Sequence, residues 1–249
     1  MGARGETMKF KKQNQHGAWA MVFMPLVIGM VAGGFHPAQL FYMAGWLMIF
    51  FMADHVLFFI KKRRKGEYGY LKAAALFFVL SAALFIYPLM VDYRIFFFFL
   101  MMLPFGAVNV YFASIRNERN IFNDISAITI FALAGGGIAF LNLHVLSWPV
   151  IFVSIISILF FTSTALFVKT MIREKKNPKY RIASYAYHGI VFIIMLSAHW
   201  ILALAFLLSL VRAVALYGRG WKMKQIGILE IVHAVWMTTL VSVHITNFM

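Results

Sequence analysis

The sequence contains no cysteine among its 249 residues. This absence excludes disulfides, thiolate metal sites and a cysteine nucleophile. Charge is also scarce, since Asp, Glu, Lys and Arg make up 12% of the chain, against about 25% in ordinary soluble domains. Acidic residues are the scarcest, with 8 Asp and Glu against 23 Lys and Arg. A chain this poor in charge cannot cover a soluble surface, so the composition excludes an ordinary soluble protein.

Apolar residues make up 63% of the chain and include 27 Phe. They form runs of about 20 residues, which predict membrane-spanning helices rather than barrel strands. The basic start before the first run resembles a signal peptide, but the many later runs favour a first helix. We predict an all-α integral membrane protein with a cytoplasmic tail over 1–15 and a single nine-helix transmembrane domain over 16–249. The expected spans are 18–34, 38–60, 71–91, 95–115, 122–143, 148–170, 182–198, 199–216 and 224–246.

The cations alternate between the connections of these predicted helices. Those at the N-terminus and in every second connection are rich in Lys and Arg, whereas the other connections contain Arg94 alone. The positive-inside rule therefore predicts a cytoplasmic N-terminus and an external C-terminus in a bacterial cytoplasmic membrane. Topology also explains the net charge of +15, and no recognition motif suggests a nucleic-acid partner.

Ionisable and polar residues inside the apolar runs are functional candidates, because charge is costly in a membrane. Counted from the nearest basic connection, they lie at a similar depth, about 10 Å below the rim. We name Asp54, His188, Glu230 and His233 as candidate acids and bases. Each has a structural alternative, in which it only packs or hydrogen-bonds between helices. The other polar groups of this layer are His55, Asn109, Tyr111, Thr162 and Ser163.

Lys169 and Arg173 are four residues apart, so a helix would place them on one face with Thr162. Such a pair suits a phosphate or diphosphate headgroup. The alternative is positive-inside topology with attraction to anionic lipids, which needs no site.

Metal sites have weaker support. Glu230 and His233 have the spacing of carboxylate-bridged metal sites, but one such pair is insufficient. Binding of a metal or haem by His16, His55, His188 and His233 remains a third hypothesis. Histidines near the predicted outer side are interpreted as interfacial residues: His36, His144, His199 and His244. The run Gly135–Gly137 is expected to allow close helix packing rather than phosphate binding.

The segments QHGAWAM at 15–21 and FVKTMIRE at 167–174 resemble the YwiC-like family of bacterial membrane proteins, and that resemblance spans essentially the whole chain. More distantly, the chain resembles the UbiA superfamily of intramembrane prenyltransferases. The segment YFASIRNERNIFNDISAITIFALAGG at 111–136 is similar to the joint between the fourth and fifth helices of that superfamily.

The UbiA resemblance implies a nine-helix bundle whose cytoplasmic cavity binds a magnesium diphosphate through two Asp-rich motifs. Here the first position, MADHVLFFIKKRRK, contains only Asp54, and Phe58 stands where a further Asp is expected. The second position, ALFVKTMIRE, contains cations instead of carboxylates. Two magnesium ions need several oxygen ligands. We therefore expect no conventional two-magnesium site, and the cofactor stays open.

The leading hypothesis is a protein that binds an anionic, phosphorylated isoprenoid or other lipid in a cytoplasm-facing polar cavity, as a divergent group transferase. Asp54 would act as acid or base with His188 or His233. The alternative is a non-enzymatic transporter or respiratory accessory protein, since buried Asp and His also suit proton relays. The candidate substrate-binding residues are Lys169, Arg173, Arg116, Asn109, Tyr111, Thr162 and His16.

Overall fold

The computed structural model describes residues 7–10, 16–62 and 67–249, and all regular secondary structure in these ranges is helical. The expected N-terminal tail lies almost wholly outside the described residues. His16 begins the first helix, but its side chain also lies outside the described part of the chain. The helices are α1 (His16–Gly33), α2 (Ala38–Lys62), α3 (Gly69–Val91), α4 (Phe96–Ser114), α5 (Ile121–Leu143), α6 (Trp148–Val168), α7 (Pro178–Ala198), α8 (Trp200–Ala215) and α9 (Met223–Phe248), with short turns of 3₁₀-helix at η2 (Tyr93–Ile95) and π-helix at η3 (Lys169–Arg173).

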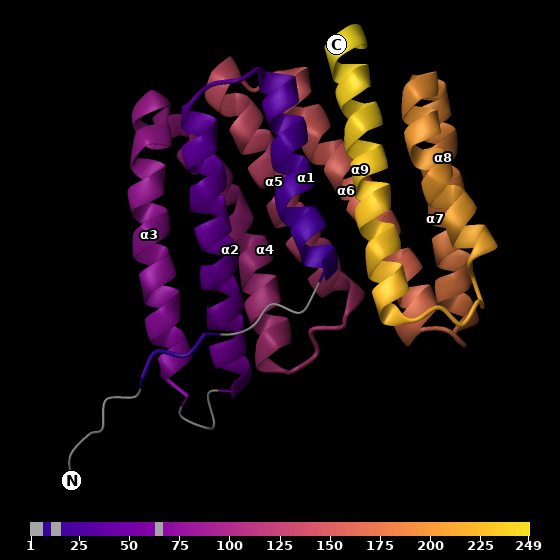
Figure 1. Ribbon diagram of the computed structural model, residues 1–249, viewed down its shortest axis with the longest axis horizontal. Coiled ribbons are helices and arrows are strands. Elements are labelled where there is room, and N and C mark those ends of the chain that lie inside the picture. Colours follow the sequence, from indigo (N-terminus) through magenta and orange to yellow (C-terminus); the bar gives the residue numbers. More distant parts are fainter. Residues whose placement is uncertain (1–6, 11–15, 63–66) are drawn as a thin grey trace.

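Successive helices run in opposite directions, so the connections gather at two ends of the bundle (Figure 1). We call the end that contains the Lys- and Arg-rich connections the basic end, and the other the opposite end. Within the described ranges, seven helical segments are long and apolar enough to cross a membrane. The apolar part of α1 and the whole of α8 are shorter, and α8 extends about 24 Å against a hydrocarbon core of about 30 Å. The all-helical, multi-pass membrane prediction is confirmed; nine complete spans and the orientation stay predictions.

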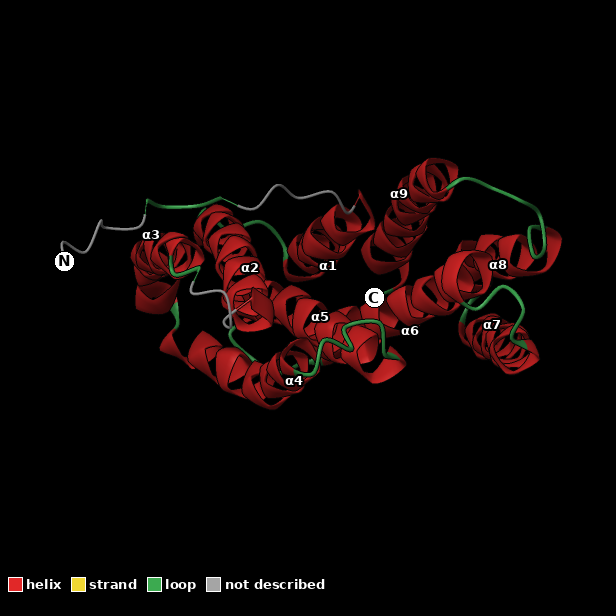
Figure 2. Ribbon diagram, turned by 90° about the horizontal axis from the view of Figure 1, so that it is seen from below, coloured by secondary structure: helices red, strands yellow, loops and turns green. Residues whose placement is uncertain are grey.

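The bundle is elongated in cross-section (Figure 2). Helices α5 and α6 lie in the middle and pack against each other, and they contain the longest sets of buried residues. Helices α2 and α3 pair at one side of the cross-section, and α7 and α8 pair at the other. Groups on α2 and groups on α7 therefore belong to opposite halves of the molecule.

Helix α1 crosses α5 at glycines. A Cβ atom added to Gly135 would lie 2.6 Å from the carbonyl oxygen of Pro25, and one added to Gly33 would lie 2.6 Å from that of Ala139. Apolar surface gives no driving force between helices in lipid, so such close backbone contact supplies much of the attraction. The close packing expected at Gly135–Gly137 is confirmed.

A buried carboxylate ties α3, α4 and α5 together at the opposite end. Asp92 accepts hydrogen bonds from the backbone nitrogen, Nε and Nη2 of Arg94, at 3.0, 2.9 and 2.7 Å. His144, in the left-handed conformation at the end of α5, places its Nδ1 2.9 Å from the same carboxylate. Hydrogen bonds from Arg94 and His144 hold the pKa of Asp92 well below its ordinary value. His144, expected as an interfacial residue, is thus a partner of Asp92.

The contact between α1 and α5 can be tested with Gly135→Ala, compared with Gly106→Ala in α4. The added methyl group at Gly135 meets backbone atoms, which is expected to cost about 1–3 kcal/mol. Gly106 has nothing within 4 Å of the new Cβ, and Ala is favoured over Gly in a helix by about 1 kcal/mol. Thermal unfolding in detergent should therefore show a lower melting temperature for Gly135→Ala only. Equal behaviour of the two variants would contradict the close contact.

Candidate functional site

Helices α6, α7, α8 and α9 enclose a set of ionisable and hydroxyl side chains, which we call the buried polar cluster. Its four ionisable members are almost inaccessible: Arg212 is 2% exposed, Glu230 4%, His188 2% and His233 0%. The cluster consists of Thr164, His188, Ser209, Arg212, Glu230 and His233.

An ion pair forms the charged part of the buried polar cluster. Arg212 Nη1 on α8 donates to Glu230 Oε1 on α9, and Arg212 Nη2 donates to Thr164 Oγ1 on α6 at 3.1 Å. The guanidinium also lies over the ring of Phe167, 4.6 Å from its centroid. Arg212 Nε and Glu230 Oε2 are buried without a hydrogen-bond partner. The pair is neutral as a whole but keeps an unused donor and an unused acceptor.

The two histidines each have one ring nitrogen engaged and one without a partner. His233 Nε2 lies 3.0 Å from Ser209 Oγ, and its Nδ1 has no partner. His188 Nδ1 lies 2.6 Å from the carbonyl oxygen of Ser184. That nitrogen must carry the proton, because a carbonyl oxygen only accepts. His188 Nε2 is therefore an acceptor, and it is buried without a partner. His188 can take up a proton at Nε2 without first breaking a hydrogen bond, and His233 can do so at Nδ1 in the tautomer whose Nε2 donates to Ser209 Oγ.

The buried polar cluster lies deep in the bundle. At 1.5 Å per residue, Glu230 and His233 lie about 11 and 15 Å from the basic end of α9, and His188 lies about 15 Å into α7. An α9 of 26 residues is about 39 Å long, so the histidines are near the middle. Glu230 lies near the predicted depth of about 10 Å and the two histidines lie about 5 Å deeper, and the structure brings the three residues together.

The comparisons with known proteins identify the family of this chain. The profile of a family described as YwiC-like protein matches residues 13–139. The chain is 36% identical over 224 residues to an uncharacterized protein of Haemophilus influenzae, covering 90% of this chain and 93% of that protein. The chain belongs to the YwiC-like family.

A second YwiC-like relative, the uncharacterized protein YwiC of Bacillus subtilis, is 32% identical over 247 residues, covering 96% of this chain and all of that protein. The relationship therefore extends through α6–α9 as well as through the residues that the profile matches. No solved structure matches the chain.

Sequence reasoning missed three members of the buried polar cluster in this YwiC-like chain, namely Thr164, Ser209 and Arg212. Arg212 could have been found, because it is a lone cation four residues inside the predicted span 199–216. The same criterion, an ionisable residue inside an apolar run, had identified Asp54 on α2. Thr164 and Ser209 carried none, because hydroxyl residues are common in membrane helices and their neighbours were unknown.

Asp54 lies on the other side of the molecule from this cluster. It is half-buried on α2, which packs against α3, α4 and α5, whereas α7 packs against α6 and α8. The neighbouring His55 turns its Nδ1 to the carbonyl oxygen of Phe51 at 2.7 Å, and its ring lies 5.3 Å from that of Phe77 on α3. The expected partnership of Asp54 with His188 or His233 is therefore wrong, because these helices occupy opposite halves.

Lys169 is buried, at 3% exposure. Its Nζ lies 2.8 Å from Asp124 Oδ2 at the start of α5 and donates to the carbonyl oxygen of Arg119. Arg173, at the other end of η3, is exposed. The expectation that these two cations jointly face one cavity is incorrect, because Asp124, which sequence reasoning missed, neutralises Lys169 in the helix interface.

The remaining predicted binding residues are spread over the basic end. Asn109 Nδ2 donates to Asn123 Oδ1 at 2.9 Å and so ties α4 to α5. Tyr111 and Arg116 are exposed, and Arg116 Nη2 lies 3.4 Å from the carbonyl oxygen of Lys61. Thr162 is buried within α6. Among the side chains described, these groups do not converge on one site.

The residues at the two positions that the expected UbiA resemblance assigns to magnesium diphosphate do not fit that group. Asp54 is one carboxylate, and the Lys169 ammonium occupies the second position in an ion pair. In the described part of the chain, no three His, Asp or Glu residues are grouped to hold a metal ion. The hypothesis of a metal or haem on four histidines also fails for its described members, because His55 is separated from His188 and His233.

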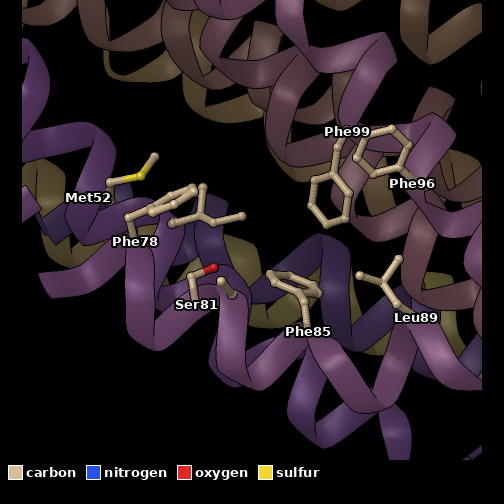
Figure 3. Close-up of a pocket in the computed structure, with 9 residues that line it drawn as sticks. Met52, Phe78, Ser81, Phe85, Leu89, Phe96 and Phe99 are labelled. Atoms are coloured by element: carbon tan, nitrogen blue, oxygen red, sulfur yellow. The ribbon is translucent and has the colours of Figure 1, made fainter. Parts of the chain in front are cut away.

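An apolar groove of about 240 Å³ lies between α2, α3 and α4 (Figure 3). Its one hydroxyl, Ser81 Oγ, is already used, since it donates to the carbonyl oxygen of Gly45 at 3.1 Å. The groove extends from the middle of α2 towards Leu89 and Phe96 at the opposite end, so it differs from the polar cavity expected at the cytoplasmic face. Its lining consists of Ile49, Met52, Phe78, Ser81, Ala82, Phe85, Leu89, Phe96 and Phe99.

The ion pair of the cluster predicts a distinctive pattern of stability. Arg212→Met or Glu230→Leu alone leaves one buried charge without its partner, which should cost about 3–5 kcal/mol. The double variant removes both charges and should recover most of that loss. Thermal unfolding in detergent measures all three.

The control for this pattern is the pair Lys61–Glu118, whose side chains are both 39% exposed. Lys61→Met should change stability by at most about 1 kcal/mol. Single cluster variants that behave like Lys61→Met would contradict a buried ion pair.

Proposed function

We propose that this YwiC-like protein is a proton-translocating membrane protein, and that the buried polar cluster is its proton-binding site. The observation that supports this proposal is the set of four buried atoms without hydrogen-bond partners on Arg212, Glu230, His188 and His233. A cluster with a purely structural role is expected to satisfy its polar atoms, because each unsatisfied buried group costs about 1–3 kcal/mol. Ionisable groups within a membrane bundle commonly form proton relays.

The ion pair links the binding of a proton at Glu230 to the net charge in the interior of the bundle. A proton that binds Glu230 at its unpartnered Oε2 neutralises the carboxylate and leaves the Arg212 guanidinium without a counter-charge. An uncompensated buried cation is costly, so a small anion entering beside Arg212 would offset that cost. Proton uptake and anion uptake are thereby linked, and the protein acts as a proton-coupled carrier of a small anion.

The two histidines extend the path from this pair. His188 Nε2 is free to accept a proton, and so is His233 Nδ1 when its Nε2 donates to Ser209 Oγ on α8. Both rings are almost fully buried.

The relatives indicate the type of membrane, and the charges indicate the orientation of the protein in it. Both relatives are bacterial, and Lys and Arg gather at the basic end. We therefore assign the protein to the bacterial cytoplasmic membrane, with the basic end and the N-terminus inside. On this assignment the ion pair lies nearer to the cytoplasm than the two histidines do.

Proton movement can be measured in liposomes that contain the protein and the pH dye pyranine, under an imposed pH gradient. The diffusible anion is chloride, phosphate or a monocarboxylate, and gluconate is the impermeant reference. Wild type should acidify the lumen faster than empty liposomes with at least one diffusible anion. Glu230→Gln should reduce that flux by about a hundredfold, as for loss of a positioned proton carrier.

Glu118→Gln is the matched control, because its carboxylate lies in an exposed ion pair, and it should leave the flux unchanged. Wild-type flux equal to that of empty liposomes with every anion would overturn the proposal. Full activity of Glu230→Gln would do the same.

A second candidate function, binding of a lipid's hydrocarbon chain, is supported by the apolar groove between α2, α3 and α4. The groove is apolar, as a lipid's hydrocarbon chain is, since eight of the nine lining residues are apolar. The occupant would be an isoprenoid or acyl chain, which keeps the lipid of the leading hypothesis from the sequence but not its polar cavity at the cytoplasmic face. The headgroup, however, could not be held by Lys169, which is neutralised at the basic end.

Ala82→Phe should fill the groove and lower the amount of lipid that copurifies with the protein. The adjacent Ala83→Phe is the matched control, because Ala83 is exposed but does not line the groove. Mass spectrometry of the extracted lipid distinguishes isoprenoid from acyl chains. Equal lipid content in the two variants would rule out occupancy of this groove.

A further inference from the structure

Two histidines meet at the opposite end of the bundle. His244 on α9 is 8% exposed, and its ring centroid lies 4.7 Å from that of His199, in the turn between α7 and α8. Phe152 on α6 and Phe248 on α9 face the same imidazole, at 5.8 and 5.9 Å. The contact between His199 and His244 joins the turn between α7 and α8 to the last turns of α9. We call these two residues the histidine pair.

The hydrogen bonds of the histidine pair leave it able to carry a proton. His199 Nδ1 accepts a hydrogen bond from the backbone nitrogen of Ile201 at 3.2 Å, so the proton of the neutral ring is on Nε2. His244 Nδ1 is buried and has no partner. Two adjacent imidazolium rings repel each other, so a proton on one ring of the histidine pair disfavours a proton on the other. A site that takes and releases single protons suits the mouth of a proton path.

Helix α9 connects the histidine pair to the buried polar cluster. His233 follows Glu230 by three residues, and His244 follows His233 by eleven. The 14 residues from Glu230 to His244 make nearly four helical turns, so the three side chains share one face of α9. All three lie on the buried side of α9. Between them on this face are Met237 and Val241, both 0% exposed. About 16 Å of apolar contact therefore separates His233 from His244.

We propose that His199 and His244 form the second mouth of the proton path, at the end opposite to the Arg212–Glu230 pair. A proton from bulk water binds one imidazole nitrogen of the histidine pair and is later passed towards His233, and no other bond changes. The apolar contacts of Met237 and Val241 keep the two sites apart in this conformation, so the path does not leak. The inference rests on the proposed function, because it assigns the far end of the same path.

The test uses the full-length protein in the same pyranine liposomes. His199→Gln with His244→Gln should reduce proton flux by about a hundredfold, as expected for loss of a proton carrier. His36→Gln is the matched control: His36 lies at the same end, and its Nδ1 accepts a hydrogen bond from the backbone nitrogen of Ala38, in the same capping geometry as His199. It should leave the flux unchanged.

Failure of this inference differs from failure of the proposed function. If Glu230→Gln loses flux while the double histidine variant retains it, the histidine pair is no part of the path and the proposed function stands. If Glu230→Gln retains flux, the proposed function itself is overturned.

A second measurement decides the matter if the double variant does not fold. Zn²⁺ binds imidazole nitrogen, and His199 is partly exposed. Zn²⁺ applied to the opposite-end face should block wild type but not His199→Gln. Equal sensitivity of the two proteins to Zn²⁺ would contradict the proposed mouth.

Discussion

The ion pair between Arg212 and Glu230 is the interaction on which the polar half of this protein depends. A charge inside a membrane bundle is costly, so each of these charges is tolerable because the other is beside it. Arg212 comes from the last turn of α8 and Glu230 from the second turn of α9. The contact thus joins two helices that differ in length, and it adds a charged contact to the packing of α6–α9.

The other half of the molecule is held together differently. Helices α1 and α5 approach closely enough at Gly135 that a single methyl group would collide with Pro25, and α2, α3 and α4 pack through aromatic side chains. A buried carboxylate, Asp92, ties the ends of three helices. This half has a tight backbone contact and an apolar groove, and the other half has a buried charge cluster. The two halves meet where α5 packs against α6 and where α1 packs against α9.

Candidate site residues were predictable from the sequence only as single residues. A charge within an apolar run is recognisable from one sequence, so Glu230, His233 and His188 could be named, as could Asp54. Depth could also be estimated, because a helix rises by a constant distance per residue. Which helix stands beside which depends on side-chain packing between segments far apart in the sequence. For that reason Asp54 was given the wrong partners, and Asp124, the partner of Lys169, was missed.

The sequence by itself determined that this is a helical membrane protein, where its described helices begin and end to within four residues, and that its cations gather at one end. Each of these follows from local composition, because lipid selects apolar runs and expels charge to their ends. Only the tertiary structure decided that Lys169 is an interface cation, that Arg212 meets Glu230, and that His199 packs against His244. The role of a buried charged side chain depends on its counter-charge, and the counter-charges of Lys169 and Arg212 lie on other helices.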